Sequence, residues 1–203
     1  AYLRGGMGDG GGCHPRDNIA LSWLARKLNI SNDFFDQIMM QREKQTDWLV
    51  ELIVQNQIKN KKTYILGKSF KPETNIMTGS PSILLDNLLK EKGIEAIKYD
   101  PYVDQNKPVF EQGVYFIGTK HEIFEKFKFP HGSVVIDPFR MINQELEHVK
   151  VIRIGNNNEY TAPTGAKGII TEKIKYESKY NLNHFAIVDN GWQTNTGFLN
   201  DEI

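Results

Sequence analysis

The fold is decided by residues 63–101, which read TYILGKSFKPETNIMTGSPSILLDNLLKEKGIEAIKYDP. The stretch opens on a short apolar, β-rich run closed by Gly67. It continues in a helical pattern that Gly93 is expected to end as the C′ residue. A second apolar run follows and ends at YDP. A strand, a helix and a strand in this order are typical of a βαβ unit with parallel strands.

Three further strands are predicted after this unit, over residues 113–119, 133–138 and 148–155. A short helix is expected between the first two, over residues 121–129. Strands that alternate with helical segments favour a parallel sheet covered on both faces. We therefore expect a doubly wound, Rossmann-like α/β domain over residues 60–155.

Two helices are predicted upstream of the sheet. Residues 15–28 carry apolar side chains at three- and four-residue steps, with Pro15 in the first turn. Residues 33–56 carry one apolar stripe over a longer than average helix, which is expected to connect two domains. The fold class is thus α/β, with a helical segment over residues 1–59 ahead of the sheet domain.

The apolar periodicity fades beyond Gly155. Residues 156–203 are expected to be an irregular C-terminal extension, whose pattern predicts no fold. One local signal is a hairpin centred on Asn190 and Gly191, since Asn-Gly supplies the positive φ angles of a type I′ turn.

The charge balance and the apolar runs exclude several classes of partner. The 203 residues include 25 basic and 25 acidic side chains, so no overall field draws the chain to nucleic acid or to an anionic membrane. No apolar run approaches the roughly 18 residues that a membrane span needs. With one cysteine and no secretion signal, a cytoplasmic location is expected. The chain starts without methionine in a glycine-rich segment, which suggests a fragment.

That cysteine, Cys13, has two interpretations. A free cysteine is commonly a small buried hydrophobe. Here three glycines precede it and Pro15 follows, which places the thiol at a helix N-terminus, where the helix dipole favours thiolate over thiol. Asp17 lies one helical turn further on and could activate a water for thioester hydrolysis. Alternatively, Asp17 only complements the dipole.

The neighbouring residues leave further alternatives open. The glycines of residues 5–12 form either a flexible linker or a loop whose backbone closely approaches a ligand. His14 has no cysteine or histidine partner at a zinc-like spacing, so no metal site is expected.

Polar residues follow three of the predicted strands. Lys71 lies in the loop after the first strand and could meet a phosphate or a sugar hydroxyl, or be a solvated loop lysine. The segments YDP (99–101) and DPFR (137–140) end two further strands at the same edge, although Asp-Pro is also common in turns. Because the first loop lacks GxGxxG, a full dinucleotide site is not expected in this domain.

Two segments together resemble the UDP-glucose/GDP-mannose dehydrogenase family. GGGCHPRDNIALSWLA is similar to the GG-x-C-x-P-[KR]-D segment of that family's helical middle domain. LGKSFKPETN, with the later YDP, is similar to segments of its Rossmann-like C-terminal domain. The resemblance runs from Arg4 to Gly155. It implies an NAD-dependent oxidation of a sugar C6 alcohol to a carboxylate through a cysteine thiohemiacetal and thioester, which serves polysaccharide precursor synthesis.

The resemblance also implies roles for individual residues. Cys13 matches the nucleophile, Asp17 the residue that assists water, and Cys13, His14 and Arg16 a stretch that borders the nicotinamide. The residues that match contacts to a UDP-sugar or GDP-sugar are Arg4, Gly8, Gly10, Phe70, Lys71 and Arg140, with Phe139 as the alternative to the last. NAD would be bound mainly by an N-terminal domain that precedes Ala1, so the fragment alone is expected to be inactive.

The family's middle domain is usually the dimer surface, so the resemblance implies a homodimer. The sequence departs from the family at Thr78, where members carry an arginine aimed at NAD, and at Asn75 and Ile76, where they carry an acidic pair. Two alternatives to the enzyme are a non-catalytic nucleotide-sugar-binding module of the same fold and an unrelated α/β protein.

Overall fold

The computed structural model describes residues 6–8, 10–155, 186–188 and 191–193. The chain divides into two compact units, Ala1–Gly155 and Asn156–Ile203. Within the described residues, no helix is long and apolar enough to cross a membrane.

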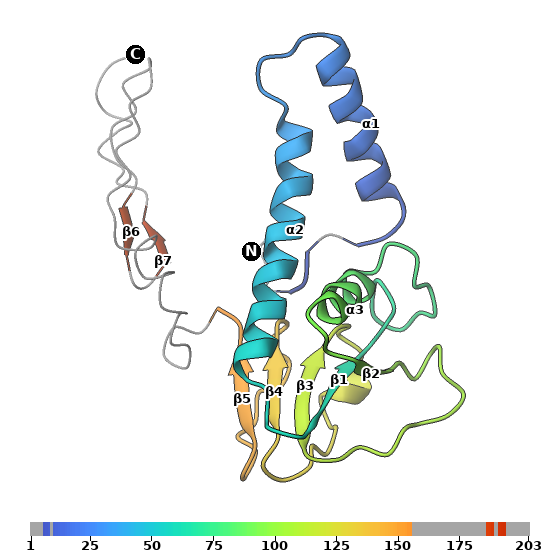
Figure 1. Ribbon diagram of the computed structural model, residues 1–203, viewed down its shortest axis with the longest axis vertical. Helices are drawn as coiled ribbons and strands as arrows, with labels where there is room; N and C mark the ends of the chain where they lie inside the picture. Colours follow the sequence, from blue (N-terminus) through green and yellow to red (C-terminus); the bar gives the residue numbers. More distant parts are fainter. Residues whose placement is uncertain (1–5, 9, 156–185, 189–190, 194–203) are drawn as a thin grey trace. The chain divides into compact units, whose positions relative to one another are not determined.

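The first unit is built on a five-stranded sheet in which every described pairing is parallel (Figure 1). The strands are β1 (Lys62–Leu66), β2 (Ala96–Tyr99), β3 (Gly113–Ile117), β4 (Val134–Asp137) and β5 (Lys150–Arg153), in the order β2-β1-β3-β4-β5. The predicted parallel sheet is confirmed. Because β2 and β3 lie on opposite sides of β1, the strand order reverses there, and ligands commonly bind at the carboxyl ends of strands at such a point.

Local signals place the helix ends. The helices are α1 (Cys13–Lys27), α2 (Phe34–Gln55) and α3 (Pro81–Glu91). The Asp33 carboxylate accepts the Asp36 N–H ahead of α2, and Ser80 caps α3 with Pro81 in the first turn. Gly93 follows α3 with φ of 76°, as predicted for a C′ glycine. α1 begins two residues earlier than expected, at Cys13.

The two faces of the sheet are covered differently. Helices α2 and α3 cover one face with fully buried leucine and isoleucine side chains, such as Ile53 and Leu89. The other face carries an aromatic cluster in which Tyr64 and Tyr115 stack at 4.6 Å, joined by phenylalanines from the loops after β2 and β3. The sheet is therefore covered on both faces as expected, but loops rather than helices cover the second.

The helix expected over residues 121–129 is wrong, because the structure has only one 3-10 turn there, η1 (Glu122–Phe124). Phe124, Phe127 and Phe129 all pack against the aromatic cluster. Their spacing of three and then two residues cannot point all three to one side of an α-helix. Leaving the helix after one turn lets all three cover the sheet.

Helices α1 and α2 form a hairpin that extends from the sheet domain (Figure 1). Ser22 donates to Asp33 Oδ2 at 2.6 Å, and Arg26 Nη2 lies 2.7 Å from Asp36 Oδ1. The buried residues of α1 are only Asn18, Ser22 and Ala25. The apolar residues that predicted this helix are exposed instead, namely Ile19, Ala20, Trp23, Leu24 and Leu28.

The predicted C-terminal hairpin is confirmed in its antiparallel pairing, but Gly191, which was expected in the turn, is the first residue of the second strand and lies opposite Val188. Strands β6 (Ala186–Val188) and β7 (Gly191–Gln193) pair antiparallel, with Ile187 opposite Trp192. Asn190, in the predicted turn, and the rest of the C-terminal extension lie outside the described residues.

Candidate functional site

The glycine segment before α1 docks onto the loop between β1 and α3, residues 68–80, here called the β1 loop. The Gly11 N–H donates to the Gly79 carbonyl at 3.1 Å. Gly10 and Gly11 lie against Phe70, such that a Cβ on Gly11 would be 3.2 Å from the Phe70 ring. At Gly79, where φ is 71°, a Cβ would lie 2.3 Å from the Gly11 carbonyl oxygen. The two sequence motifs, about sixty residues apart, therefore meet at one site without room for side chains between them.

The earlier part of the glycine segment runs beside α2 and the loop after β4. A Cβ on Gly8 would lie 3.2 Å from Gln45 of α2, and one on Gly6 would lie 3.2 Å from the Phe139 ring. Arg140 is exposed and has a positive φ of 54°. Among the described contacts, Phe139 rather than Arg140 touches the glycine segment. Arg4 lies outside the described residues.

Cys13 is the first residue of α1, and it is exposed. The Arg16 guanidinium donates from Nε to Asp17 Oδ1 at 2.8 Å. The pKa of Arg16 is raised by Asp17 and, to a smaller degree, by Cys13, which places positive charge close to the sulfur. The hydrogen bond from Arg16 is the main cause that lowers the pKa of Asp17. The structure thus groups Cys13, Arg16 and Asp17 on the first turns of α1.

His14 and Lys71 are two further residues of the predicted site. Asn18 donates to the His14 carbonyl at 2.9 Å, and its amide nitrogen lies 3.3 Å from His14 Nδ1. Lys71 is exposed, and its Nζ lies 5.3 Å from the centre of the Phe70 ring. Within the described residues, no group of three metal-ligating side chains is placed to hold a metal ion.

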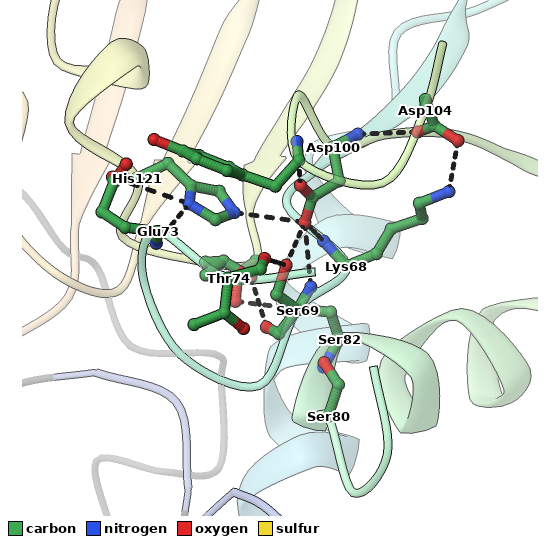
Figure 2. Close-up of polar contacts among 12 residues, drawn as sticks. Lys68, Ser69, Glu73, Thr74, Ser80, Ser82, Asp100, Asp104 and His121 are labelled. Carbon is green, nitrogen blue, oxygen red and sulfur yellow. Dashed lines mark hydrogen bonds and ion pairs between the residues drawn. The ribbon is translucent and has the colours of Figure 1, made fainter. Parts of the chain in front are cut away.

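A buried polar network, which the sequence did not predict, holds the β1 loop against the carboxyl ends of β2 and β3 (Figure 2). Asp100, directly after β2, is fully buried. Its Oδ2 accepts the N–H groups of Lys68 and Ser69 at 2.7 and 2.9 Å. The Ser69 hydroxyl lies 2.6 Å from the same oxygen. His121, also fully buried, lies with Nε2 3.1 Å from this oxygen.

The YDP segment indicated a polar residue at this edge of the sheet, but no signal pointed to His121. Its position two residues after Thr119, just beyond β3, was the only available hint, since the ends of adjacent parallel strands share an edge. Side-chain pairing between loops separated by some fifty residues cannot be deduced from local pattern.

Asp100 predicts a pH dependence of stability. Burial favours its neutral form, but hydrogen bonds from His121, Ser69 and Lys68 outweigh burial and lower its pKa from 3.8 to about 2. The ionised group therefore stabilises the fold by about 2 kcal/mol at pH 7. This contribution is complete above about pH 4 and is lost as the pH falls through 2.

We expect Asp100→Asn to lower the free energy of unfolding by about 2 kcal/mol at pH 7 and by about half as much at pH 3. Urea unfolding at both pH values measures the difference. Asp47→Asn, at an exposed position of α2, is the control and should change stability little at either pH. An equal loss at pH 7 and pH 3 for Asp100→Asn would contradict the linkage.

The sequence has relatives among curated proteins, although no protein-family model matches it. It is 30% identical to the GDP-mannose 6-dehydrogenase of Pseudomonas putida over 158 residues, which cover 78% of this chain and 33% of that protein. It is also 30% identical to the UDP-glucose 6-dehydrogenase TuaD of Bacillus subtilis over 102 residues, covering 49% of this chain and 22% of the relative. The chain spans about a third or less of these relatives.

Solved structures share the fold. A UDP-glucose dehydrogenase from the archaeon Pyrobaculum islandicum matches 73% of this chain and 38% of its own, with a TM-score of 0.61 and 22% identity. A ternary complex of GDP-mannose dehydrogenase from Pseudomonas aeruginosa matches 74% of this chain and 41% of its own, with a TM-score of 0.61 and 23% identity. The hairpin and the sheet domain therefore have the arrangement found in part of these chains.

Proposed function

Because the chain belongs to the nucleotide-sugar 6-dehydrogenase family and spans only part of its members, we propose that it is the C-terminal part of such an enzyme. The substrate would be a UDP-sugar or GDP-sugar, whose C6 alcohol is oxidised to a carboxylate with NAD. The observation that supports this proposal is the docking of the glycine segment onto the β1 loop. It brings the exposed thiol of Cys13 next to the carboxyl edge of the sheet.

Cys13 would act as the nucleophile. Its sulfur adds to the aldehyde carbon and forms a C–S bond, which gives a thiohemiacetal. Loss of a hydride from that carbon leaves a thioester, and water then cleaves the C–S bond to release the carboxylate and the thiol. Asp17, with 56% of its side chain exposed, is accessible to orient that water and accept its proton. Arg16 supplies positive charge close to both residues.

NAD, when bound, would supply the hydride acceptor for both oxidations. Cys13, His14 and Arg16 are all exposed at the start of α1, which fits a place for them beside the nicotinamide of that cofactor. Thr78 lies close to Gly12. The β1 loop therefore presents a neutral side chain at the position where the resemblance implies an arginine in other members of the family.

The nucleotide sugar would lie along the glycine segment. Gly8 and Gly10 are half-buried, and the Phe70 side chain lies against Gly10 and Gly11. Lys71 is free to pair with a phosphate or a sugar hydroxyl. Arg140, at the edge formed by the loop after β4, would add a second positive charge.

Calorimetric titration of the chain with UDP-glucose and with GDP-mannose tests this proposal. We expect one of them to bind, and Phe70→Ala to weaken that binding about tenfold or more, because the ring that supports the glycine segment is lost. Ile123→Ala, at an exposed apolar residue of η1, is the control. If neither ligand bound, the alternative of an unrelated α/β protein would be favoured.

A homodimer through α1 is also proposed. The exposed apolar residues of α1 and its C-cap include Trp23 and Leu28, each more than 60% exposed. Burying a patch of this kind against a second copy removes it from water and stabilises the association. We expect the double variant Trp23→Lys, Leu28→Lys to be monomeric in sedimentation equilibrium at concentrations where the wild type dimerises. Glu43→Lys, on the exposed side of α2, should leave the dimer intact, and a monomeric wild type would contradict the proposal.

A further inference from the structure

We propose that Asp100 and His121 are positioning residues that hold the β1 loop in the shape needed to bind the nucleotide sugar. Neither side chain is exposed, so neither can touch a ligand. They act through the loop, whose outer surface carries Phe70 and Gly79. This inference rests on the proposed function, which assigns the nucleotide sugar as the ligand of the β1 loop.

The first contact point is the exit from β1. Asp100 Oδ2 receives hydrogen bonds from the backbone of Lys68 and Ser69 and is approached by the Ser69 hydroxyl. A second carboxylate, Asp104, lies against the ammonium group of Lys68 at 2.5 Å. The chain direction on leaving the strand is therefore set by two acidic residues of the segment after β2. An amide at position 100 would turn its own N–H groups toward some of these donors, so the charge itself is needed.

The second contact point lies at the middle of the loop. The Glu73 N–H donates to His121 Nδ1 at 3.0 Å, so this nitrogen carries no proton. The proton is then on Nε2, which donates to Asp100. Glu73 has a positive φ of 57°, a conformation that a non-glycine residue adopts at a cost unless its surroundings hold it. Its carboxylate accepts the Glu122 N–H at 3.0 Å, which gives the loop a further attachment to η1.

Phe70, between the two contact points, and Gly79, beyond the second, are the groups of the loop that we propose to face the ligand. The Phe70 N–H donates to the Ile76 carbonyl at 3.0 Å, so the loop closes on itself. The Ser69 hydroxyl also lies 2.6 Å from the Thr74 carbonyl. The closed loop presents the Phe70 ring and the Gly79 backbone to the glycine segment. Loosening either contact point would shift both surfaces and the start of α1 that depends on them.

The structure offers a matched control for burial and charge. Asp86 in α3 is another buried carboxylate, and its Oδ2 lies 2.7 Å from Lys98 Nζ and 2.9 Å from Lys90 Nζ. Neither partner belongs to the β1 loop. Asp86→Asn therefore removes a buried charge and its ion pairs without touching the loop, and it separates loss of stability from loss of positioning.

The test compares Asp100→Asn with Asp86→Asn in calorimetric titrations with whichever of UDP-glucose and GDP-mannose the wild type binds. The titrations are made below the unfolding temperature of every variant. We expect the dissociation constant to rise about tenfold or more for Asp100→Asn and less than about twofold for Asp86→Asn. Equal affinities of Asp100→Asn and the wild type would overturn the proposal.

Two variants of His121 each keep one of its two hydrogen bonds. They also test the proposal if Asp100→Asn does not fold. His121→Gln can still donate to Asp100, and His121→Asn can still accept the Glu73 N–H. Each should bind the nucleotide sugar more tightly than His121→Ala. If all three bound alike, His121 would have no positioning role.

Amide hydrogen exchange gives a readout that needs no ligand. Asp100→Asn should speed exchange across residues 70–79 and 10–13, whereas Asp86→Asn should not. If the wild type bound neither nucleotide sugar, the proposed function would fail. Hydrogen exchange would then test only whether Asp100 and His121 hold the β1 loop in place. Unchanged exchange in Asp100→Asn would overturn that claim too.

Discussion

Replacing Cys13 by serine should abolish the second oxidation, from the aldehyde to the carboxylate, and lower the steady-state rate of NAD reduction by the full-length protein by about 10³-fold or more. A serine hydroxyl at this position is a much weaker nucleophile than a cysteine at neutral pH. Because Cys13 lies at the exposed start of α1, serine creates no cavity and buries no polar group. The effect should therefore fall on the reaction and not on folding.

Absorbance of the reduced cofactor measures this loss, and two further measurements interpret it. Calorimetric affinity for the nucleotide sugar should stay within about twofold of the wild type, since Phe70 and the glycine segment remain in place. Alkylation of Cys13 by iodoacetamide should slow when the nucleotide sugar is bound. Sustained formation of the carboxylate by Cys13→Ser would rule out the nucleophile, while a wild type that binds but never reduces NAD would favour the non-catalytic binding module.

Replacing Gly79 by alanine should be the most damaging single change at the junction of the two motifs. The new Cβ would lie 2.3 Å from the Gly11 oxygen and 2.4 Å from its carbonyl carbon, both of which are backbone atoms. Backbone cannot rotate away as a flexible side chain can, so the glycine segment must move off the β1 loop. We expect a loss of stability above about 2 kcal/mol and at least about a tenfold loss of nucleotide-sugar affinity.

Gly93→Ala is the matched control for this change. Gly93 has nearly the same φ, 76° against 71° at Gly79, but nothing lies within 4 Å of its would-be Cβ. It should therefore lose only about 1 kcal/mol, the cost of a left-handed alanine, and no affinity. Urea unfolding and calorimetry on the two variants give the comparison. Similar losses for both would mean that backbone conformation, rather than the close approach of Gly11, makes Gly79 necessary.

Much of the secondary structure could be predicted because its signals are local. Ser80 and Pro81 mark the start of α3, and Gly93 marks its end. Each of these residues acts on backbone groups within one or two turns of the helix. Alternation of strands and helices was enough to predict parallel pairing. The helix expected after β3 was wrong because Phe127 and Phe129 pack against the aromatic cluster. This packing outweighs the local helical pattern of the segment.

The apolar residues of α1 show a different limit. Their spacing predicts a helix correctly, but it does not say whether the apolar side is buried within the chain. In the structure, Ser22 and Ala25 of α1 are buried, Ser22 donates to Asp33 at the start of α2, and Trp23 is left exposed. Which side of an amphipathic helix faces its neighbour depends on what else competes for that surface, including other copies of the chain.

The sequence by itself determined the order of the elements, the parallel sheet and the pair of motifs around Cys13 and Phe70, since all of these depend on residue type and short spacing. Only the tertiary structure decided that Gly11 meets Gly79 without room for a Cβ, and that Asp100 and His121 brace the loop behind them. These contacts join residues between about 20 and 70 positions apart. They depend on the relative placement of strand ends, which packing of the whole sheet sets and no local pattern records.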